Sequence, residues 1–381
     1  MASGTLSDAD RILRSGETGD ATPAHRPVAR AADTEADTEA VRAPEPPVGK
    51  RGGTLRWGLG ALALILAVLI GLGTWWSLQP KKFDVAANMH QRVGGEDRVV
   101  SGAATVSAAI AVADTLLSKP GGYLSNDLTP PGAVMDNMQS WEYGALTELR
   151  DSIRALRNDF SRSQTQSIEN EDLKQADSLL NFDSEAWVLP SSEQEYRQGI
   201  GALEHYLADL ASRSSGARFY ARADNLSAYL AVVEKRLGSY GQRLSASVGN
   251  AELLAGLAEA EGGSSSGGRP LLATGAEGLD RTPWNEIDDV FFEARGYSWA
   301  LVHMMKALAI DFATVLRDKN AEVSMQQVIR DLEYATVRKW SPLVLNGDGF
   351  GVLANHSLVL ASYMARANAA VLDLRELLQR G

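Results

Sequence analysis

The longest apolar stretch of the chain runs from Trp57 to Leu78 and contains no charged side chain. A helix needs roughly 20 apolar residues to cross a hydrocarbon core of about 30 Å, so this run is long enough to span a bilayer. Lysine and arginine flank it on both sides, and tryptophan stands at each end, where indole rings favour the headgroup level. We therefore predict a transmembrane helix over residues 53–78, with the lipid bilayer as one partner of the protein.

Two other interpretations of this run fit its sequence less well. A buried soluble helix is seldom apolar on every face over such a length. A cleaved signal peptide has a shorter apolar region near the start of the chain, whereas a long polar tail precedes this run and Trp75 and Trp76 close it. Basic residues are slightly more numerous before the run than after it. The positive-inside rule then predicts a single-pass protein of the bacterial inner membrane, with a cytoplasmic N-terminus and a periplasmic C-terminal region.

Beyond the apolar run, apolar residues recur every three or four positions, which is the period of an amphipathic helix. The longest such pattern runs from Trp284 to Asn320 and predicts one long helix that Gly296 loosens locally. Ser192 and Glu195 form a capping box, which predicts that a helix begins there and continues to about Ser212. Similar stripes predict further helices over residues 102–118, 141–160, 220–244, 324–339 and 354–379.

These patterns predict an all-α fold: one N-terminal transmembrane helix, then a multi-helix bundle with at most a minor β-hairpin. The hairpin is expected at the glycine-rich turn 346–351, because Asn-Gly favours positive φ. Residues 1–52 are polar and low in complexity, and we predict that they are disordered. Residues 81–260 and 281–381 are expected to form one helical bundle, joined by a Gly/Ser-rich linker or loop at 261–280. Two separate domains are the alternative.

Charge and composition narrow the functional classes. The net charge is −11, and almost all of it falls after the apolar run, so we expect no nucleic-acid partner. The chain has no cysteine, which excludes disulfides, thiolate metal sites and cysteine nucleophiles. No two of the five histidines are four residues apart, so neither a metal site nor a cofactor is predicted. His303 follows Trp299 by one helical turn and is expected to pack in the core.

The candidate catalytic residues lie beside the glycine-rich turn, near the start of the last predicted helix. They are His356, Asp348 and Asn355. The start of a helix offers free N–H groups and favours an anion, which is the basis of this hypothesis. Simple capping of the helix by Asn355 or Ser357 is the structural alternative.

The candidate ligand-binding residues are Arg222, Asp224, Arg366 and Arg157. Arg222 and Arg366 each follow a tyrosine by a few residues in an Ala-rich segment, where ion pairing between helices is the alternative to a polar ligand cleft. Arg157, together with Arg162, offers the guanidinium geometry that binds a carboxylate through two hydrogen bonds. A solvated charged face explains this second pair equally well.

Several strings of residues resemble a known family of bacterial proteins. The strings include KPGGYLSND at 119–127, LRNDFSRSQ at 156–164, FYARADNL at 219–226, RLSASVG at 243–249, SWAL at 298–301 and ANHS at 354–357. They resemble an uncharacterised family of single-span membrane proteins, a domain of unknown function designated family twenty-three thirty-three. The likeness covers about residue 83 to the C-terminus. It implies a single-span membrane protein and supplies no activity and no catalytic residue.

The sequence therefore favours a membrane-anchored helical scaffold or interaction protein of the bacterial cell envelope, with an envelope protein as its partner. An envelope hydrolase or transferase with a polar site near residues 346–357 is the alternative, and a ligand-sensing domain is the third interpretation. Whether the protein is an enzyme stays open at this stage.

Overall fold

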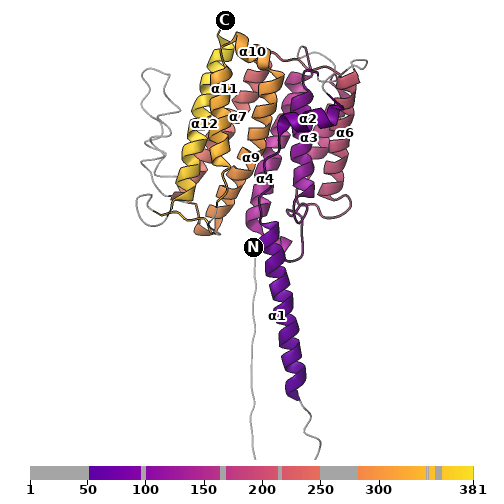
Figure 1. Ribbon diagram of the computed structural model, residues 1–381, viewed down its shortest axis with the longest axis vertical. Helices are drawn as coiled ribbons and strands as arrows, with labels where there is room; N and C mark the ends of the chain where they lie inside the picture. Colours follow the sequence, from indigo (N-terminus) through magenta and orange to yellow (C-terminus); the bar gives the residue numbers. More distant parts are fainter. Residues whose placement is uncertain are drawn as a thin grey trace, which may run out of the picture. The chain divides into compact units, whose positions relative to one another are not determined.

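The fold of the chain, given by a computed structural model, consists almost entirely of helices (Figure 1). The structure describes residues 51–95, 100–163, 169–212, 217–248, 282–339, 341, 343–347 and 354–380. Its α-helices are α1 Arg51–Trp76, α2 Val85–Val93, α3 Ala103–Ser118, α4 Asp136–Ala155, α5 Glu171–Leu180, α6 Ser192–Ser212, α7 Ala223–Val248, α9 Ile287–Asp311, α10 Ala313–Asp318, α11 Glu322–Ala335 and α12 His356–Gln379. Two 3-10 turns, η2 Gly132–Val134 and η5 Trp284–Glu286, and one π-helical turn, η3 Leu156–Phe160, complete the set.

The predicted all-α class is confirmed. No strand occurs within the described ranges. At the expected hairpin these ranges contain one isolated antiparallel bridge, between Asn346 and Asn355. Residues 348–353 of the glycine-rich turn lie outside the described part of the chain, as do the linker segment 261–280 and residues 1–50 of the predicted tail. Residues 56–381 form one compact unit.

Helix α9 lies at the centre of the bundle. It packs against α3, α4, α7 and α11, and Figure 1 shows the long helices of the bundle running side by side. Nearly every side chain from Ala294 to Leu308 is buried. A helix that is apolar around most of its circumference is stable only when other helices surround it, which explains why this segment occupies the interior.

Two glycines bring α4 and α9 into direct backbone contact. A Cβ atom on Gly296 would lie 1.9 Å from the carbonyl oxygen of Trp141, and one on Gly144 would lie 1.9 Å from that of Glu293. Neither position can therefore hold a larger residue while the helices keep this spacing. The expectation that Gly296 loosens its helix is replaced by a packing role, since the missing side chain is what lets the helices approach.

The single helix predicted over residues 284–320 is wrong, because α9 ends at Asp311 and α10 begins at Ala313. The Asp311 carboxylate accepts hydrogen bonds from the backbone N–H of Gly102 at 2.8 Å and of Thr105 at 2.7 Å. It thereby caps α3, which has no capping side chain of its own. Phe312 turns into an aromatic cluster with Phe160 and Phe219. The break thus serves contacts that are distant in sequence.

The capping box at Ser192 is also wrong, although α6 does begin at that residue. Ser191 supplies the capping oxygen, since its Oγ accepts from the N–H of Gln194 at 3.3 Å. The buried Ser192 instead donates to the carbonyl oxygen of Asp183 at 2.7 Å. The predicted helices over 102–118, 141–160, 220–244, 324–339 and 354–379 correspond to α3, α4, α7, α11 and α12, whereas α2 and α5 were not predicted.

The bundle has two ends that are distinguished by their contacts. At the α1 end, the loop 119–135 lies against the last turns of α1, and Asp289 at the start of α9 accepts a hydrogen bond from Ser140 of α4. The loop 181–191 joins this end, because Asn126 donates to the carbonyl oxygen of Ala186 at 2.8 Å. The opposite, far end holds the Asp311 cap and the aromatic cluster around Phe312.

Candidate functional site

The last turn of α1 is held against the bundle at Trp76 and Gly121. Gly121 has φ +88°, a backbone conformation that residues other than glycine rarely adopt. A Cβ atom at this position would lie 2.7 Å from the Trp76 ring. One turn earlier, a Cβ on Gly73 would lie 3.6 Å from the Cβ of Pro131. The end of the apolar helix therefore packs directly on the loop that joins α3 to α4.

A buried carboxylate fixes that loop. Glu142 of α4 is fully buried and accepts from the N–H groups of Leu124 and Ser125, both at 2.9 Å, and from the Ser125 hydroxyl at 2.6 Å. It also forms an ion pair with the fully buried Lys119 ammonium. Burial raises the pKa of Glu142, and Lys119 and these hydrogen bonds oppose the shift. The segment 119–127 thus binds the Glu142 carboxylate through several of its residues, and this places Gly121 against Trp76.

The segment that follows α1 is bound to α9 by a second contact. Gln79 accepts two hydrogen bonds from the Arg295 guanidinium, from Nη2 at 2.8 Å and Nε at 3.2 Å. Arg295 is only 5% exposed and also donates to the carbonyl oxygens of Ala335 at 3.1 Å and Val337 at 2.9 Å. These carbonyls lie at and just beyond the C-terminus of α11, whose dipole favours a cation. Burial lowers the pKa of Arg295 to about 10, so the group stays charged at neutral pH.

A third contact binds Phe83 to the middle of α9. The Phe83 N–H donates to Nε2 of His303 at 3.1 Å, and the two rings stack with centroids 4.0 Å apart. Nδ1 of His303 then donates to the carbonyl oxygen of Trp299 at 2.6 Å, which fixes the neutral tautomer. Burial lowers the pKa of His303 to about 4. The sequence-based expectation of a core histidine one turn after Trp299 is confirmed.

We call these three contacts together the joint: Trp76 on Gly121, Gln79 on Arg295, and Phe83 on His303. Each uses a side chain or backbone group that is buried or close-packed on the bundle side. Removing the partner of a buried arginine or histidine lowers the stability of the fold, because polar groups away from water need hydrogen bonds. The segment from the end of α1 to the start of α2 is therefore a fixed connection and differs from a flexible tether.

A buried carboxyl group lies between α4, α7 and α9. Glu148 is fully buried and accepts from the Tyr229 hydroxyl and from the Ser152 hydroxyl at 2.8 Å. Burial raises the pKa of Glu148 to about 8, so the carboxyl is mostly protonated at neutral pH. Next to it, Asp151 is paired with Arg236 at 2.7 Å. A neutral acid in this position links α4 to α7 through hydrogen bonds.

The structure brings Asn355 and His356 together, where both side chains close the loop before α12. Asn355 caps the helix by accepting from the Leu358 N–H at 2.9 Å, and its amide donates to the carbonyl oxygen of Gly347 at 2.6 Å. His356 Nδ1 accepts from the Leu345 N–H at 2.8 Å. Asp348 lies outside the described residues. The catalytic role of these three residues stays a prediction, and the capping alternative accounts for Asn355.

The candidate ligand-binding residues lie in separate local ion pairs. Arg222 pairs with Asp224 at 2.5 Å, and both side chains are exposed near the start of α7. Arg366 of α12 pairs with the buried Asp331 of α11 at 2.5 Å and lies over the Tyr363 ring. Near the C-terminus of α12, Gln379 meets Ser227 of α7, so the two helices are antiparallel. Arg222 and Asp224 therefore lie at the opposite end of this helix pair from His356.

Arg157 and Arg162 do clamp a carboxylate, and it belongs to the chain itself. Glu169 accepts from Arg157 at 2.8 Å and lies 3.6 Å from Arg162. Arg157 also pairs with Asp177 of α5 at 2.7 Å. Hydrogen bonds to these carboxylates raise the pKa of Arg157. The clamp therefore joins the end of α4 to α5.

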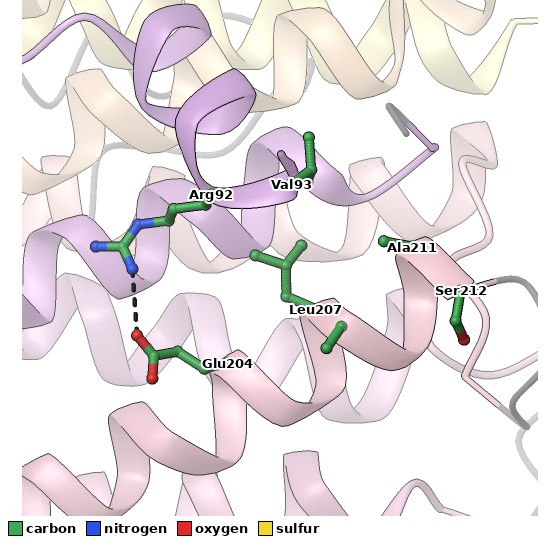
Figure 2. A pocket seen from close by; sticks show the side chains of 7 residues that line it. Arg92, Val93, Glu204, Leu207, Ala211 and Ser212 are labelled. Carbon is green, nitrogen blue, oxygen red and sulfur yellow. Dashed lines mark hydrogen bonds and ion pairs between the residues drawn. The ribbon is translucent and has the colours of Figure 1, made fainter. Parts of the chain in front are cut away.

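Sequence reasoning missed a groove between α2 and α6. It has a volume of about 680 Å³ and is lined by Arg92 and Val93 of α2 and by Leu207, Ala208 and Ala211 of α6, among others. Figure 2 shows Arg92 and Glu204 pointing toward one another across it, with their side chains 3.4 Å apart. Because α2 was not predicted, no sequence signal pointed to this groove.

A group of possible metal ligands was also missed. Asp172 of α5 and His205 and Asp209 of α6 each offer a ligand atom, and these atoms lie within 4.8 Å of one another. His205 Nδ1 is 2.9 Å from Asp172 Oδ1. The spacing of His205 and Asp209 by four residues on one helix was the available signal. His205 is exposed while the two aspartates are partly buried, and His205 and Asp172 already form a hydrogen-bonded pair.

Comparison with known proteins gives a family and no activity. No curated protein and no solved structure matches the chain. One family model matches residues 50–381, so the match includes the apolar helix α1 as well as the whole bundle, whereas the sequence-based likeness began at about residue 83. The chain belongs to the family described as "Uncharacterized protein conserved in bacteria (DUF2333)".

Proposed function

We propose that this protein is a membrane-anchored helical scaffold of the bacterial cell envelope, with α1 in the inner membrane, a cytoplasmic N-terminus and a periplasmic bundle. Residues Arg56–Trp76 have a mean hydropathy of 2.1, and none of the most apolar stretch is buried by the protein. Leu64 and Ile70, for example, are 66% and 68% exposed. Apolar surface on this scale is unfavourable in water and is satisfied by lipid. The family match, which begins at residue 50, supports α1 as a feature of the family.

The joint is the observation that carries the scaffold role. A flexible tether would suffice to keep a domain near the membrane, and it would need no buried contacts. Here Gln79 and Phe83 are bound to Arg295 and His303 of the central helix. Such a connection sets the orientation of the bundle relative to its anchor, which is what a protein needs when it presents one face to an envelope partner.

Cysteine labelling tests the topology directly, because the chain has no native cysteine. Val323, which is 78% exposed at the start of α11, and Ser15 in the N-terminal tail are each replaced by cysteine. A membrane-impermeant maleimide should label Val323→Cys in intact spheroplasts, and Ser15→Cys only after the membrane is opened. Labelling of Ser15→Cys alone in intact spheroplasts would reverse the proposed orientation.

Crosslinking before detergent extraction tests the partner. At native expression, the wild-type protein should recover a defined second protein from the envelope. The complex should weaken at least several-fold in Gln79→Ala/Arg295→Met, which removes the contact between Gln79 and Arg295 from the joint. It should persist in Arg222→Met, which removes an exposed ion pair and one hydrogen bond to the Ser163 carbonyl oxygen, both away from the joint. Recovery of the protein alone, or equal recovery from both variants, would contradict a scaffold that depends on a fixed orientation.

A further inference from the structure

The exposed apolar side chains on the loops of the bundle are not evenly distributed. In the loop 119–135, Leu128 is 63% exposed and Val134 is 71% exposed. At the far end, the turns 100–102, 161–163, 217–222 and 319–321 carry no exposed large hydrophobic side chain, whereas Val323, in the first turn of α11, is 78% exposed. Soluble surfaces tolerate single exposed apolar residues, but a concentration of them at one end marks an interaction surface.

The loop 181–191 continues this concentration. Trp187, Val188 and Leu189 are consecutive, and their exposed fractions are 60%, 48% and 91%. Leu189 has φ +60°, in the left-handed region that a bulky residue rarely adopts. The backbone here thus takes an unfavourable conformation while it holds an apolar side chain out in solvent. Asn126 ties this loop to the loop 119–135 by donating to the carbonyl oxygen of Ala186, and it also donates to the carboxylate of Glu193 in the first turn of α6, each at 2.8 Å.

Trp284 adds a third position at the same end. It lies in η5, immediately before α9, and its side chain is 85% exposed. A tryptophan combines a large apolar body with one N–H donor, and it favours the interfacial zone of a bilayer. We call these exposed residues the apolar rim: Leu128, Val134, Trp187, Val188, Leu189 and Trp284.

The position of α1 indicates what covers the apolar rim. Gly73 lies in the apolar helix and packs on Pro131, between Leu128 and Val134 of the loop 119–135. Gly73 is three residues before the last residue of α1, which is about 4.5 Å along a helix axis. If α1 spans a bilayer, Pro131 is therefore at the level where lipid headgroups begin. The rest of the rim surrounds the same end of the bundle.

We propose that the apolar rim is a second membrane contact, in which these loops insert into the interfacial layer of the leaflet that α1 leaves. This inference rests on the proposed anchor. Asp183, Glu185 and Glu286 lie beside the rim in sequence, so the contact is apolar and needs no anionic lipid. The apolar rim would bind the bundle to the bilayer surface at several points around α1. This contact complements the joint, which binds the end of α1 to the bundle.

Depth-dependent fluorescence quenching tests the contact in the full-length chain. Single cysteines replace Leu189, Trp284, Leu64 and Val323, each is labelled with an environment-sensitive fluorophore, and the protein is reconstituted in phosphatidylcholine vesicles that carry spin-labelled lipid. The probes at Leu189→Cys and Trp284→Cys should be quenched at least twofold more by headgroup-level spin labels than the probe at Val323→Cys. The probe at Leu64→Cys, within α1, should be quenched best by labels deep in the acyl chains.

The outcomes separate the two proposals. If Leu64→Cys is quenched at depth while Leu189→Cys and Trp284→Cys behave like Val323→Cys, the anchor stands and the rim contact is overturned. If only one loop probe behaves like Val323→Cys, the contact is overturned for that loop. If Leu64→Cys is not quenched, the membrane anchor itself fails, and the rim contact fails with it.

Discussion

Gln79, three residues beyond the end of α1, accepts two hydrogen bonds from Arg295, whose side chain is 5% exposed. Arg295→Met should leave the Gln79 oxygen and two backbone carbonyls without a donor and cost about 2–4 kcal/mol of the free energy of unfolding. Gln79→Ala should cost less, about 1 kcal/mol, because water can replace part of the contact. Thermal unfolding in detergent measures both.

The control for this pair is Arg222→Met. Arg222 forms an ion pair with Asp224, but both side chains are more than half exposed, so the expected change is below about 0.5 kcal/mol. If Arg295→Met proved as mild as Arg222→Met, the contact between Gln79 and Arg295 would not hold the segment after α1.

Close packing between α4 and α9 predicts an unusually severe alanine substitution. Gly296→Ala would place a methyl group 1.9 Å from the Trp141 carbonyl oxygen, so the two helices must separate. We expect Gly296→Ala to lower the free energy of unfolding by more than about 3 kcal/mol. Gly201→Ala is the matched control, because a Cβ at Gly201 on α6 meets nothing within 4 Å. It should stabilise the protein by up to about 1 kcal/mol through helix propensity. Equal effects of the two substitutions would refute the backbone contact.

The contact between Trp76 and Gly121 can be separated from the backbone preference of glycine. Gly121 and Gly122 both have positive φ, +88° and +74°, but a Cβ at Gly122 meets only the Leu117 carbonyl oxygen, at 3.9 Å. Gly122→Ala should therefore cost about 1 kcal/mol from backbone strain alone, and Gly121→Ala should cost at least 1 kcal/mol more. Adding Trp76→Ala to Gly121→Ala should recover that excess. Without such recovery, Trp76 does not pack on this loop.

The buried Glu148 predicts a specific pH dependence. Its pKa is raised by burial to about 8, whereas a carboxyl in the unfolded chain titrates near 4.5. Between these values the unfolded state is ionised and the folded state is not, so the contribution of Glu148 to stability is fully present below pH 4.5 and is lost as pH rises to 8. The full loss is on the order of 4 kcal/mol.

Glu148→Gln removes this loss, because the amide stays neutral and keeps an acceptor for Tyr229 and Ser152. The melting temperature of the variant relative to wild type should therefore rise steadily from pH 5 to pH 8. The exposed Glu322→Gln serves as the control and should show no such trend. A constant difference between Glu148→Gln and wild type across this range would contradict a protonated Glu148.

The accuracy of the sequence-based predictions depended on how local the determining contacts are. The apolar period alone was enough to predict α4 and α7, because each carries its own stripe of apolar residues. It failed at residue 311, where Asp311 ends α9 in order to cap α3, a partner 206 residues away. Short helices such as α2, with nine residues, have too few turns for the period to stand out.

The site was less predictable than the fold for the same reason. Arg157, Arg222 and Arg366 stood out as polar residues in suggestive strings, and each is satisfied by a nearby carboxylate. The joint gave no local signal, since Gln79 and Arg295 are 216 residues apart and a glutamine after an apolar helix is unremarkable in a sequence. Only the folded chain brings these residues together.

The connection between α1 and the bundle is fixed, and a distance measurement between the two parts tests this directly. Leu64→Cys and Val323→Cys are combined in one full-length chain, each cysteine is spin-labelled, and the protein is placed in lipid nanodiscs. Pulsed electron spin resonance then reports the distribution of distances between the two labels. A narrow distribution is expected for the wild type, with clear broadening in Gln79→Ala/Arg295→Met. If the distribution without these two substitutions is as broad as that of Gln79→Ala/Arg295→Met, a flexible tether joins α1 to the bundle. That result would contradict a fixed connection.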